Sequence, residues 1–197
     1  MRQGKTFIIC GPSGVGKGTV VARLLASDPT LYFSVSATTR EPRPGEIDGK
    51  HYHFLTHEQF EQWVQEDAFL EHAEYVGNRY GTPKKFIDKA MAQGRDVILD
   101  IEIQGADLVY SKRPDIVRIY VAPPSWTELE RRLIGRGTED MDKVRSRLER
   151  GKQEFMAAKE FDYFVINDTV DRAVEEITAI MCAEHCKPDE RIEMINR

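Results

Sequence analysis

A glycine-rich run near the amino end of the sequence has the spacing of a phosphate-binding loop. It reads G-x-x-x-x-G-K and consists of Gly11, Pro12, Ser13, Gly14, Val15, Gly16 and Lys17. Glycines let the backbone curl so that successive N–H groups point at one anion, and the final lysine can reach the β- and γ-phosphates of a nucleotide. An apolar run precedes the loop and a helical pattern follows it, which is the required order. The pattern predicts a site for a nucleoside triphosphate.

The position after the lysine departs from the usual loop. Serine or threonine commonly stands there and binds Mg²⁺, whereas this chain has Gly18, followed by Thr19. Asp100 ends another apolar run, where a magnesium-binding carboxylate is expected. Thr19, Asp100 and water therefore stay open as alternative sources of magnesium ligands.

Apolar runs of strand length alternate with segments of helical periodicity along most of the chain. The expected strands are 6–10, 96–101, 116–121 and 163–166, and helices are expected after the first strand and over about 170–183. Fully apolar strands separated by helices predict an α/β fold, a parallel sheet flanked by helices of the kind found in P-loop NTPases. Helix starts are predicted by capping boxes at 56–59 and 125–128 and by Thr82-Pro83, with Gly94 ending the helix after Thr82.

The segment from about 43 to 81 breaks this alternation. Short apolar runs at 51–55 and 68–76 flank a helical pattern, which predicts a small α+β insertion. We expect one domain over 1–197, divided into a core of 1–36 and 82–197 and an insertion of about 37–81. A polar, glycine-containing stretch between two helical patterns predicts a mobile lid at about 135–147.

Composition and charge narrow the class of protein. The 197 residues are 41% hydrophobic with a formal net charge of −5, which argues against a nucleic-acid binder. Arginines nevertheless gather at 40–43 and at 131–150, as a small polyanion would require, although a solvated helix face is the better explanation for any single arginine. No apolar run is long enough for a membrane span, no secretory signal is expected, and the three cysteines suit a reducing cytoplasm. No pattern predicts an oligomeric state.

An ordered set of further motifs resembles the guanylate kinase family. The motifs are S-V-S-A-T-T-R-E-P-R-P-G-E at 34–46, G-K-H-Y-H-F at 49–54, E-H-A-E-Y at 71–75, G-N-R-Y-G-T at 77–82, D-I-E-I-Q-G at 100–105, R-L-I-G-R-G-T at 132–138 and I-N-D at 166–168. The resemblance covers about residues 5–184 and implies an ATP- and Mg²⁺-dependent transfer of a phosphoryl group to GMP, and to dGMP, in purine nucleotide metabolism.

The resemblance also implies roles for individual residues. The acceptor phosphate is held by Arg40, Arg43, Tyr52 and Tyr80, while Arg132, Arg136 and Arg147 converge with Lys17 on the phosphoryl group in transfer. Because the attacking phosphate oxygen is already anionic, cations rather than a general base are what the reaction needs. Guanine offers N–H donors and a carbonyl acceptor, and the residues implied for it are Glu71, Ser36, Thr82 and Glu102. Asn167 lies in the segment that resembles the family's contact with the base of ATP.

Two other functions stay open at this point. A guanylate-kinase-like binding module without catalysis would be expected to have a degraded phosphate loop, whereas Gly16 and Lys17 are intact. A related kinase acting on a phosphorylated ribose would not need the guanine set. A metal site at Cys182, His185 and Cys186 is disfavoured, because three ligands on a terminal helix have no evident fourth.

Overall fold

The computed structural model describes residues 3–75, 77–135 and 141–195. Its centre is a parallel sheet with the strand order β2-β7-β1-β8-β9. The strands are β1 (Thr6–Cys10), β2 (Tyr32–Phe33), β7 (Val97–Asp100), β8 (Val117–Ala122) and β9 (Tyr163–Ile166). The predicted parallel sheet is therefore confirmed, and two of its strands have the expected bounds.

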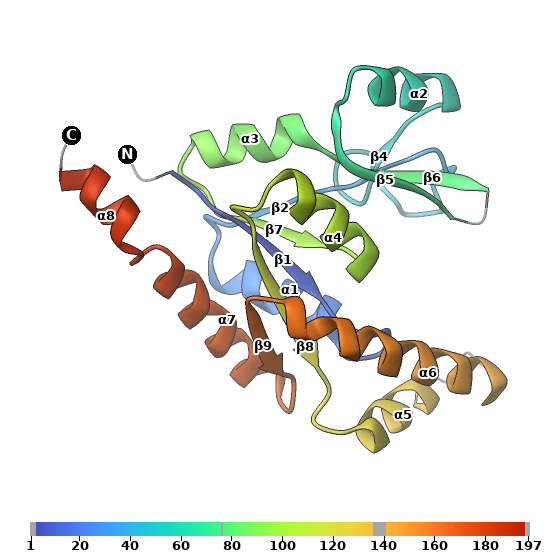
Figure 1. Cartoon of the computed structure of the whole chain (residues 1–197). Coiled ribbons are helices and arrows are strands. Elements are labelled where there is room, and N and C mark those ends of the chain that lie inside the picture. Colours follow the sequence, from blue (N-terminus) through green and yellow to red (C-terminus); the bar gives the residue numbers. More distant parts are fainter. Residues whose placement is uncertain (1–2, 76, 136–140, 196–197) are drawn as a thin grey trace.

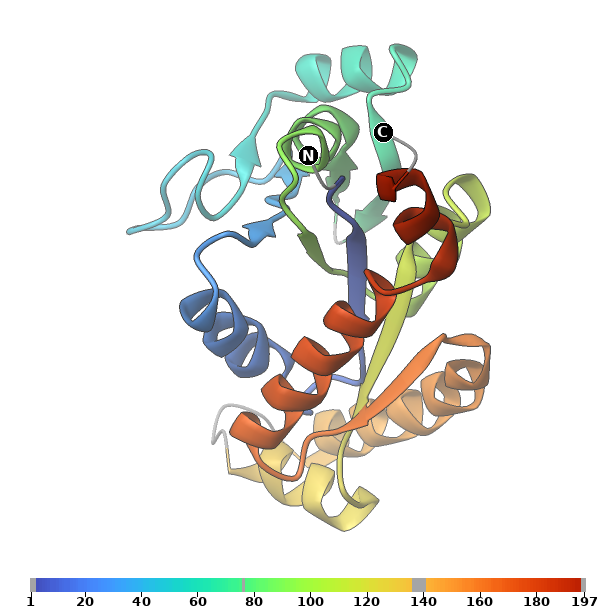
Figure 2. The same ribbon diagram turned by 90° about the vertical axis from the view of Figure 1, so that its left-hand side faces the viewer.

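Helices cover both faces of this sheet. Successive side chains of a strand point to opposite faces, so each face carries its own set of apolar residues to be buried. Phe7 and Ile9 of β1 belong to one buried cluster with α1 (Lys17–Ser27) and α7 (Val170–Glu184). Ile8 and Cys10 belong to a second cluster with α3 (Lys84–Ala92) and α4 (Ile103–Lys112). Figure 2 shows α1 and α7 together on one side of the sheet. This two-sided burial explains why the strand sequences are apolar throughout.

A second, mixed sheet forms the part of the chain predicted as an α+β insertion. Its order is β4-β3-β6-β5, with β3 (Ala37–Thr38), β4 (His53–Phe54), β5 (Phe69–Tyr75) and β6 (Asn78–Pro83). Helix α2 (His57–Gln65) packs on it through Phe60, whose ring stacks on Phe69 with centroids 4.6 Å apart. The predicted capping box of this helix is complete, with Thr56 and Gln59 bonded reciprocally.

The remaining helices follow β8 and β9. They are α5 (Trp126–Ile134), α6 (Met141–Ala157), the short 3₁₀ helix η1 (Ala158–Glu160) and α8 (Pro188–Ile195). Figure 1 shows the second sheet at the upper right and α5 with α6 at the lower right, with the end of β1 between them. The predicted lid overlaps this region, and its residues 136–140 lie outside the described ranges. Within those ranges no helix combines the length and the apolar character that crossing a bilayer requires.

One predicted helix start and one predicted capping box differ from the structure. Thr82 and Pro83 end strand β6, and α3 begins at Lys84 without a side-chain cap, because the Thr82 hydroxyl is bonded elsewhere. Ser125 does cap α5 by accepting from the N–H of Glu128. The Glu128 carboxylate, however, pairs with arginines of its own helix, so the second bond expected of a capping box is replaced.

Candidate active site

The glycine-rich loop follows β1 and leads into α1, as its spacing predicts. Gly16 has a φ of 99°, a left-handed conformation that favours glycine, and it caps the amino end of α1. At Gly11 a Cβ atom would lie 2.2 Å from the carbonyl oxygen of Val121, so β8 approaches the loop too closely for a side chain. The first helical N–H groups therefore face an anion site at the carboxyl edge of the sheet.

Lys17 and Asp100 meet beside this loop. The Nζ atom of Lys17 lies 3.4 Å from an Asp100 carboxylate oxygen and 3.4 Å from the carbonyl oxygen of Gly11. Parallel pairing of Ile9 with Asp100 brings the carboxylate to the end of β1. The structure thus joins two residues that are far apart in the sequence, at the position expected for nucleotide phosphates and a cation.

Asp100 and Thr19, the residues predicted to hold Mg²⁺, both lie beside the phosphate loop. Thr19 is exposed on the first turn of α1, and a Cβ at the preceding Gly18 would meet nothing within 4 Å. In the described ranges no group of three or more histidine, cysteine, aspartate and glutamate side chains forms a metal site of its own. Mg²⁺ does not need such a group, because it commonly keeps several waters and binds one or two carboxylates together with substrate phosphates.

On the second sheet, Arg40, Tyr52 and Tyr80 lie together. The Arg40 guanidinium is 5.4 Å from the centroid of the Tyr52 ring, and the rings of Tyr52 and Tyr80 are 6.0 Å apart. Arg40 also forms an ion pair of 2.9 Å with Glu46, and the other Glu46 oxygen accepts from the backbone N–H of Arg43 at 2.7 Å. Three of the four residues predicted for the acceptor phosphate are thus in one cluster.

Sequence reasoning assigned no role to Glu46, although it lies inside one of the quoted motifs. Its hydrogen bond to Arg40 is the main reason that its pKa falls to about 2. The same hydrogen bond raises the pKa of Arg40. Glu46 therefore stays ionised at any physiological pH and holds Arg40 in place.

Glu71 and Thr82 form the polar pair predicted for guanine. The Thr82 hydroxyl donates to Glu71 Oε1 at 2.6 Å, across the adjacent strands β5 and β6. Burial raises the pKa of Glu71, although the Thr82 hydrogen bond opposes this effect. A Cβ placed on Gly105 of α4 would lie 3.7 Å from the Glu71 carboxyl group, so this carboxylate faces the core domain. Ser36 is half-buried directly before β3, and its carbonyl accepts from the N–H of His53.

Glu102, the fourth residue implied for guanine, lies apart from this pair. It precedes α4, its side chain is 74% exposed, and its carboxylate accepts from Arg150 of α6 at 2.6 Å. The structure therefore connects Glu102 to α6 and not to Glu71 or Thr82.

The arginines of α5 and α6 approach the phosphate loop from the side opposite the second sheet. Arg147 donates to the hydroxyl of Ser13 at 3.2 Å. Arg132 donates to the carbonyl oxygens of Val15 and Asn167, both at 3.0 Å, and to Glu128 at 2.8 Å. Arg136 lies outside the described residues. Lys17, Arg132 and Arg147 are accordingly gathered at the loop, and their action on the transferred phosphoryl group stays a prediction.

Comparison with known proteins identifies the family. A family model described as "Guanylate kinase" matches residues 3–184. The chain belongs to the guanylate kinase family. The match agrees with the extent of the resemblance seen in the motifs, and α8 lies beyond it.

Individual guanylate kinases resemble the chain over nearly its whole length. The guanylate kinase of Lactococcus lactis is 47% identical over 191 residues, covering 97% of this chain and 93% of its own. That of Rubrobacter xylanophilus is 50% identical over 181 residues, covering 92% of this chain and 95% of its own. The crystal structure of guanylate kinase from Anaplasma phagocytophilum superimposes with a TM-score of 0.74 at 31% identity, covering 95% of this chain and 89% of that one.

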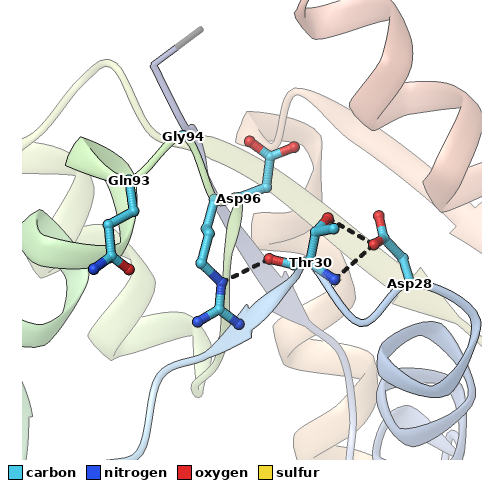
Figure 3. Close-up of a pocket in the computed structure, with 6 residues that line it drawn as sticks. Asp28, Thr30, Gln93, Gly94 and Asp96 are labelled. Carbon is cyan, nitrogen blue, oxygen red and sulfur yellow. Dashed lines mark hydrogen bonds between the residues drawn. The ribbon is translucent and has the colours of Figure 1, made fainter. Parts of the chain in front are cut away.

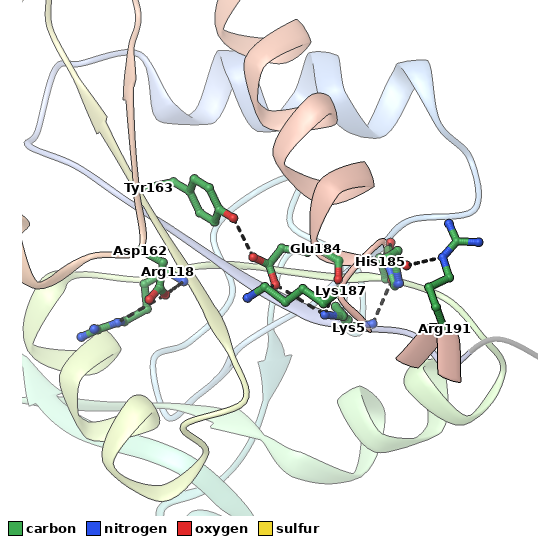
Figure 4. A network of polar contacts seen from close by, with 9 residues as sticks. Lys5, Arg118, Asp162, Tyr163, Glu184, His185, Lys187 and Arg191 are labelled. Carbon is green, nitrogen blue, oxygen red and sulfur yellow. Dashed lines mark hydrogen bonds and ion pairs between the residues drawn. The ribbon is translucent and has the colours of Figure 1, made fainter. Parts of the chain in front are cut away.

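The opposite, amino edge of the sheet carries a separate set of polar groups. A hollow of about 440 Å³ lies there, lined by residues 28, 30 and 93–96 (Figure 3). Next to it, both oxygens of Asp96 lie 2.9 Å from Nε2 of buried His185 (Figure 4 shows the surrounding network). Cys182 and Cys186 are exposed thiols. His185 is thus engaged with Asp96 within the fold, remote from the family's phosphate loop.

Proposed function

We propose that this chain transfers the γ-phosphoryl group of ATP to the phosphate of GMP, and that it accepts dGMP in the same way. The observation that carries the proposal is the pair of Glu71 and Thr82. A half-buried carboxylate oriented by a hydroxyl accepts the N1–H and N2–H donors of guanine, which adenine, cytosine and uracil do not present in that arrangement. The contacts that we assign are to the base and the phosphate of the acceptor. None of them is to the ribose 2′-hydroxyl, which is why dGMP is expected to be accepted as well.

The acceptor binds to the second sheet. We assign its base to Glu71 and Ser36, with the Ser36 hydroxyl donating to guanine O6 while Thr82 orients the carboxylate. Glu102 would reach the base only by releasing Arg150. We assign the phosphate to Arg40 and Arg43 with the hydroxyls of Tyr52 and Tyr80, since two cations and two donors match a dianion.

ATP binds to the loop from Gly11 to Thr19, beside Asn167. An oxygen of the GMP phosphate attacks the γ-phosphorus, the bond from that phosphorus to the β-bridging oxygen breaks, and ADP leaves with the electron pair. Lys17 and Arg147, with Arg132 and Arg136, supply the positive charge that stabilises this transition state. Asp100 and Thr19 would hold Mg²⁺, which would supply further positive charge to the phosphates of ATP.

We further propose that the segment of about 43–81 approaches the core of 1–36 and 82–197 when GMP binds, and that the lid of about 135–147 closes with ATP. Closure would exclude water, which otherwise competes as acceptor. Paired distance probes on α2 and α7 test this: the distance should shorten with GMP and a non-hydrolysable ATP analogue, and an unchanged distance would exclude the motion.

We assign the enzyme to the cytoplasm, where Cys10, Cys182 and Cys186 would remain free thiols.

ADP release measured with GMP, dGMP, AMP, CMP, UMP and ribose 5-phosphate tests the function. Rapid turnover with the two guanine nucleotides alone is the expected result. Binding of GMP without turnover would indicate a binding module, and turnover of ribose 5-phosphate would indicate a sugar-phosphate kinase. Either result would overturn the proposal.

A further inference from the structure

The carbonyl oxygen of Val15, in the phosphate loop, receives two hydrogen bonds from outside the loop. One comes from the side-chain Nδ2 of Asn167 at 2.8 Å, and the other comes from Arg132 at 3.0 Å. Asn167 follows strand β9 and is only 3% exposed. Its own backbone is fixed as well, because its N–H donates to the carbonyl of Ala122 and its carbonyl accepts from Arg132.

These bonds determine which way the next peptide N–H points. The Val15 carbonyl and the Gly16 N–H belong to one planar trans peptide, in which the two groups point in opposite directions. Because Asn167 and Arg132 hold the oxygen on the outer side of the loop, the Gly16 N–H is directed away from them. Among the described residues no acceptor takes this N–H, as is usual for a donor at the start of a helix that binds an anion.

Asn167 and Gly16 also fit against each other. A Cβ atom on Gly16 would lie 2.7 Å from Nδ2 of Asn167, closer than such atoms can approach. The amide of Asn167 therefore fills the space that a side chain at position 16 would occupy. This contact gives a steric reason for glycine at position 16, in addition to its positive φ.

We propose that Asn167 is a positioning residue, which directs the Gly16 N–H at the phosphates of ATP by holding the Val15 carbonyl. This inference rests on the proposed function and changes the role of Asn167 within it. The segment 166–168 resembles the family's contact with the base of ATP, but the Asn167 side chain is buried and bonded to the phosphate loop. Its effect on the donor nucleotide should be the same whatever base the nucleotide carries.

Asn167→Ala tests the inference without adding charge, and Asn167→Asp replaces the donating NH₂ with an oxygen that faces the Val15 oxygen. Losing one hydrogen bond of this kind corresponds to roughly a 5- to 10-fold change in an equilibrium constant, and the two opposed oxygens in Asn167→Asp should give a larger one. The readouts are KM for ATP, KM for GMP, and the inhibition constant of inorganic tripolyphosphate against ATP. Tripolyphosphate has the phosphates of ATP and no base. Gln93→Glu, at the far edge of the sheet (Figure 3), is the matched amide-to-carboxylate control.

The inference predicts that KM for ATP and the tripolyphosphate constant rise by the same factor in each Asn167 variant, while KM for GMP is unchanged. A rise in KM for ATP alone would mean that Asn167 contacts the base, and would overturn the inference. A lowered melting temperature with both constants unchanged would mean a purely structural role, and would overturn it too. Failure of the wild-type enzyme to form GDP would instead refute the proposed function, so the two failures are distinguishable.

Discussion

Replacing Glu71 with glutamine keeps the shape of the side chain and removes its charge. In the wild-type structure the Thr82 hydroxyl donates to Glu71 Oε1 at 2.6 Å. In Glu71→Gln this hydroxyl will select the amide oxygen, because the amide NH₂ cannot accept a hydrogen bond. The NH₂ group then occupies the position of Oε2, where our assignment places the N–H donors of guanine. Two donors would face each other there.

The expected loss follows from hydrogen-bond energies. A hydrogen bond to a charged group contributes about 1.5–3 kcal/mol, and an unsatisfied buried donor costs about 1–3 kcal/mol. Taking about 3 kcal/mol in total, KM for GMP should rise roughly 150-fold, since each 1.4 kcal/mol is a factor of ten. Adenine carries an acceptor at N1, which matches the new NH₂, so selectivity for GMP over AMP should fall by more than KM for GMP alone suggests.

The pH dependence provides a second measure of the same group. Burial raises the pKa of Glu71, and only the ionised carboxylate can accept two guanine N–H groups. KM for GMP should therefore rise as the pH falls through this raised pKa, at a higher pH than an ordinary glutamate would give. In Glu71→Gln this part of the pH profile should disappear.

The variant should still fold. A carboxyl whose folded-state pKa is raised contributes stability below its unfolded pKa and loses it as the pH rises through the folded pKa. At neutral pH the ionised Glu71 is therefore unfavourable for folding, and glutamine removes that cost. Urea unfolding is expected to show no loss of stability in Glu71→Gln, so that the kinetic change can be read as a binding effect.

The assay is ADP release with GMP and with AMP, each at varied ATP, with Glu61→Gln as the control. Glu61 is a glutamate of the same insertion, but it pairs with Arg79 on the α2 side. A rise in KM for GMP with unchanged KM for ATP is expected. Equal increases for both nucleotides, or no increase for either, would refute the assignment of Glu71 to guanine.

Three further predictions concern the loop and the second sheet. Lys17→Ala should lower kcat by orders of magnitude while calorimetry still detects GMP binding, because the lysine acts on the phosphoryl group in transfer; near-normal turnover would exclude that role. Gly18→Ser should retain activity, since a Cβ there meets nothing within 4 Å, and a magnesium titration will show whether the new hydroxyl changes the metal requirement. Thr56→Ala removes the cap of α2 and should lower the free energy of unfolding by about 1 kcal/mol, measured in urea, with KM for ATP unchanged.

The sequence predicted the central sheet well because its strands are buried on both faces. The runs 6–10 and 163–166 coincide with β1 and β9, and the strand expected at 116–121 is displaced from β8 by one residue at each end. The two-residue strands β2 and β3 were not predicted, since such short segments have no periodicity. Helix α8 was also missed, although it follows directly after the predicted terminal helix.

Errors occurred where another contact competed with the local signal, across strands in one case and within a helix in the other. Thr82-Pro83 has the local pattern of a helix start, but pairing with β5 extends β6 through both residues, and Glu71 takes the hydroxyl. Glu128 has the local pattern of a capping box, but its carboxylate is bonded to Arg131 and Arg132 instead. In both cases a charged side chain binds the group that the predicted cap would have used, the Thr82 hydroxyl in the first case and the Glu128 carboxylate in the second.

For the site, residue types were predictable and most partners were not. Glu128 could be expected beside Arg132, because the two are four residues apart on a predicted helix. The motifs also named Arg40 and Lys17, but nothing in their spacing indicates that Glu46 and Asp100 form ion pairs with them. Those pairings depend on strand register, as for Asp100 next to β1, or on a turn that brings Glu46 back to Arg40. The role of Asn167 was obscured for the same reason, because the carbonyl that it binds is 152 positions away in the chain.

These pairings bear on how the enzyme binds two polyanions. Arg40 lies 2.9 Å from Glu46, Arg132 lies 2.8 Å from Glu128, and Lys17 lies 3.4 Å from Asp100. A cation that already has a carboxylate partner gains from a phosphate only the difference between the two interactions, so these contacts add less affinity than bare cations would. The phosphate must then either displace the carboxylate or share the cation with it. Tight binding before transfer would consequently depend more on the loop N–H groups and the guanine site, while the paired cations remain in position for the charge that develops during transfer.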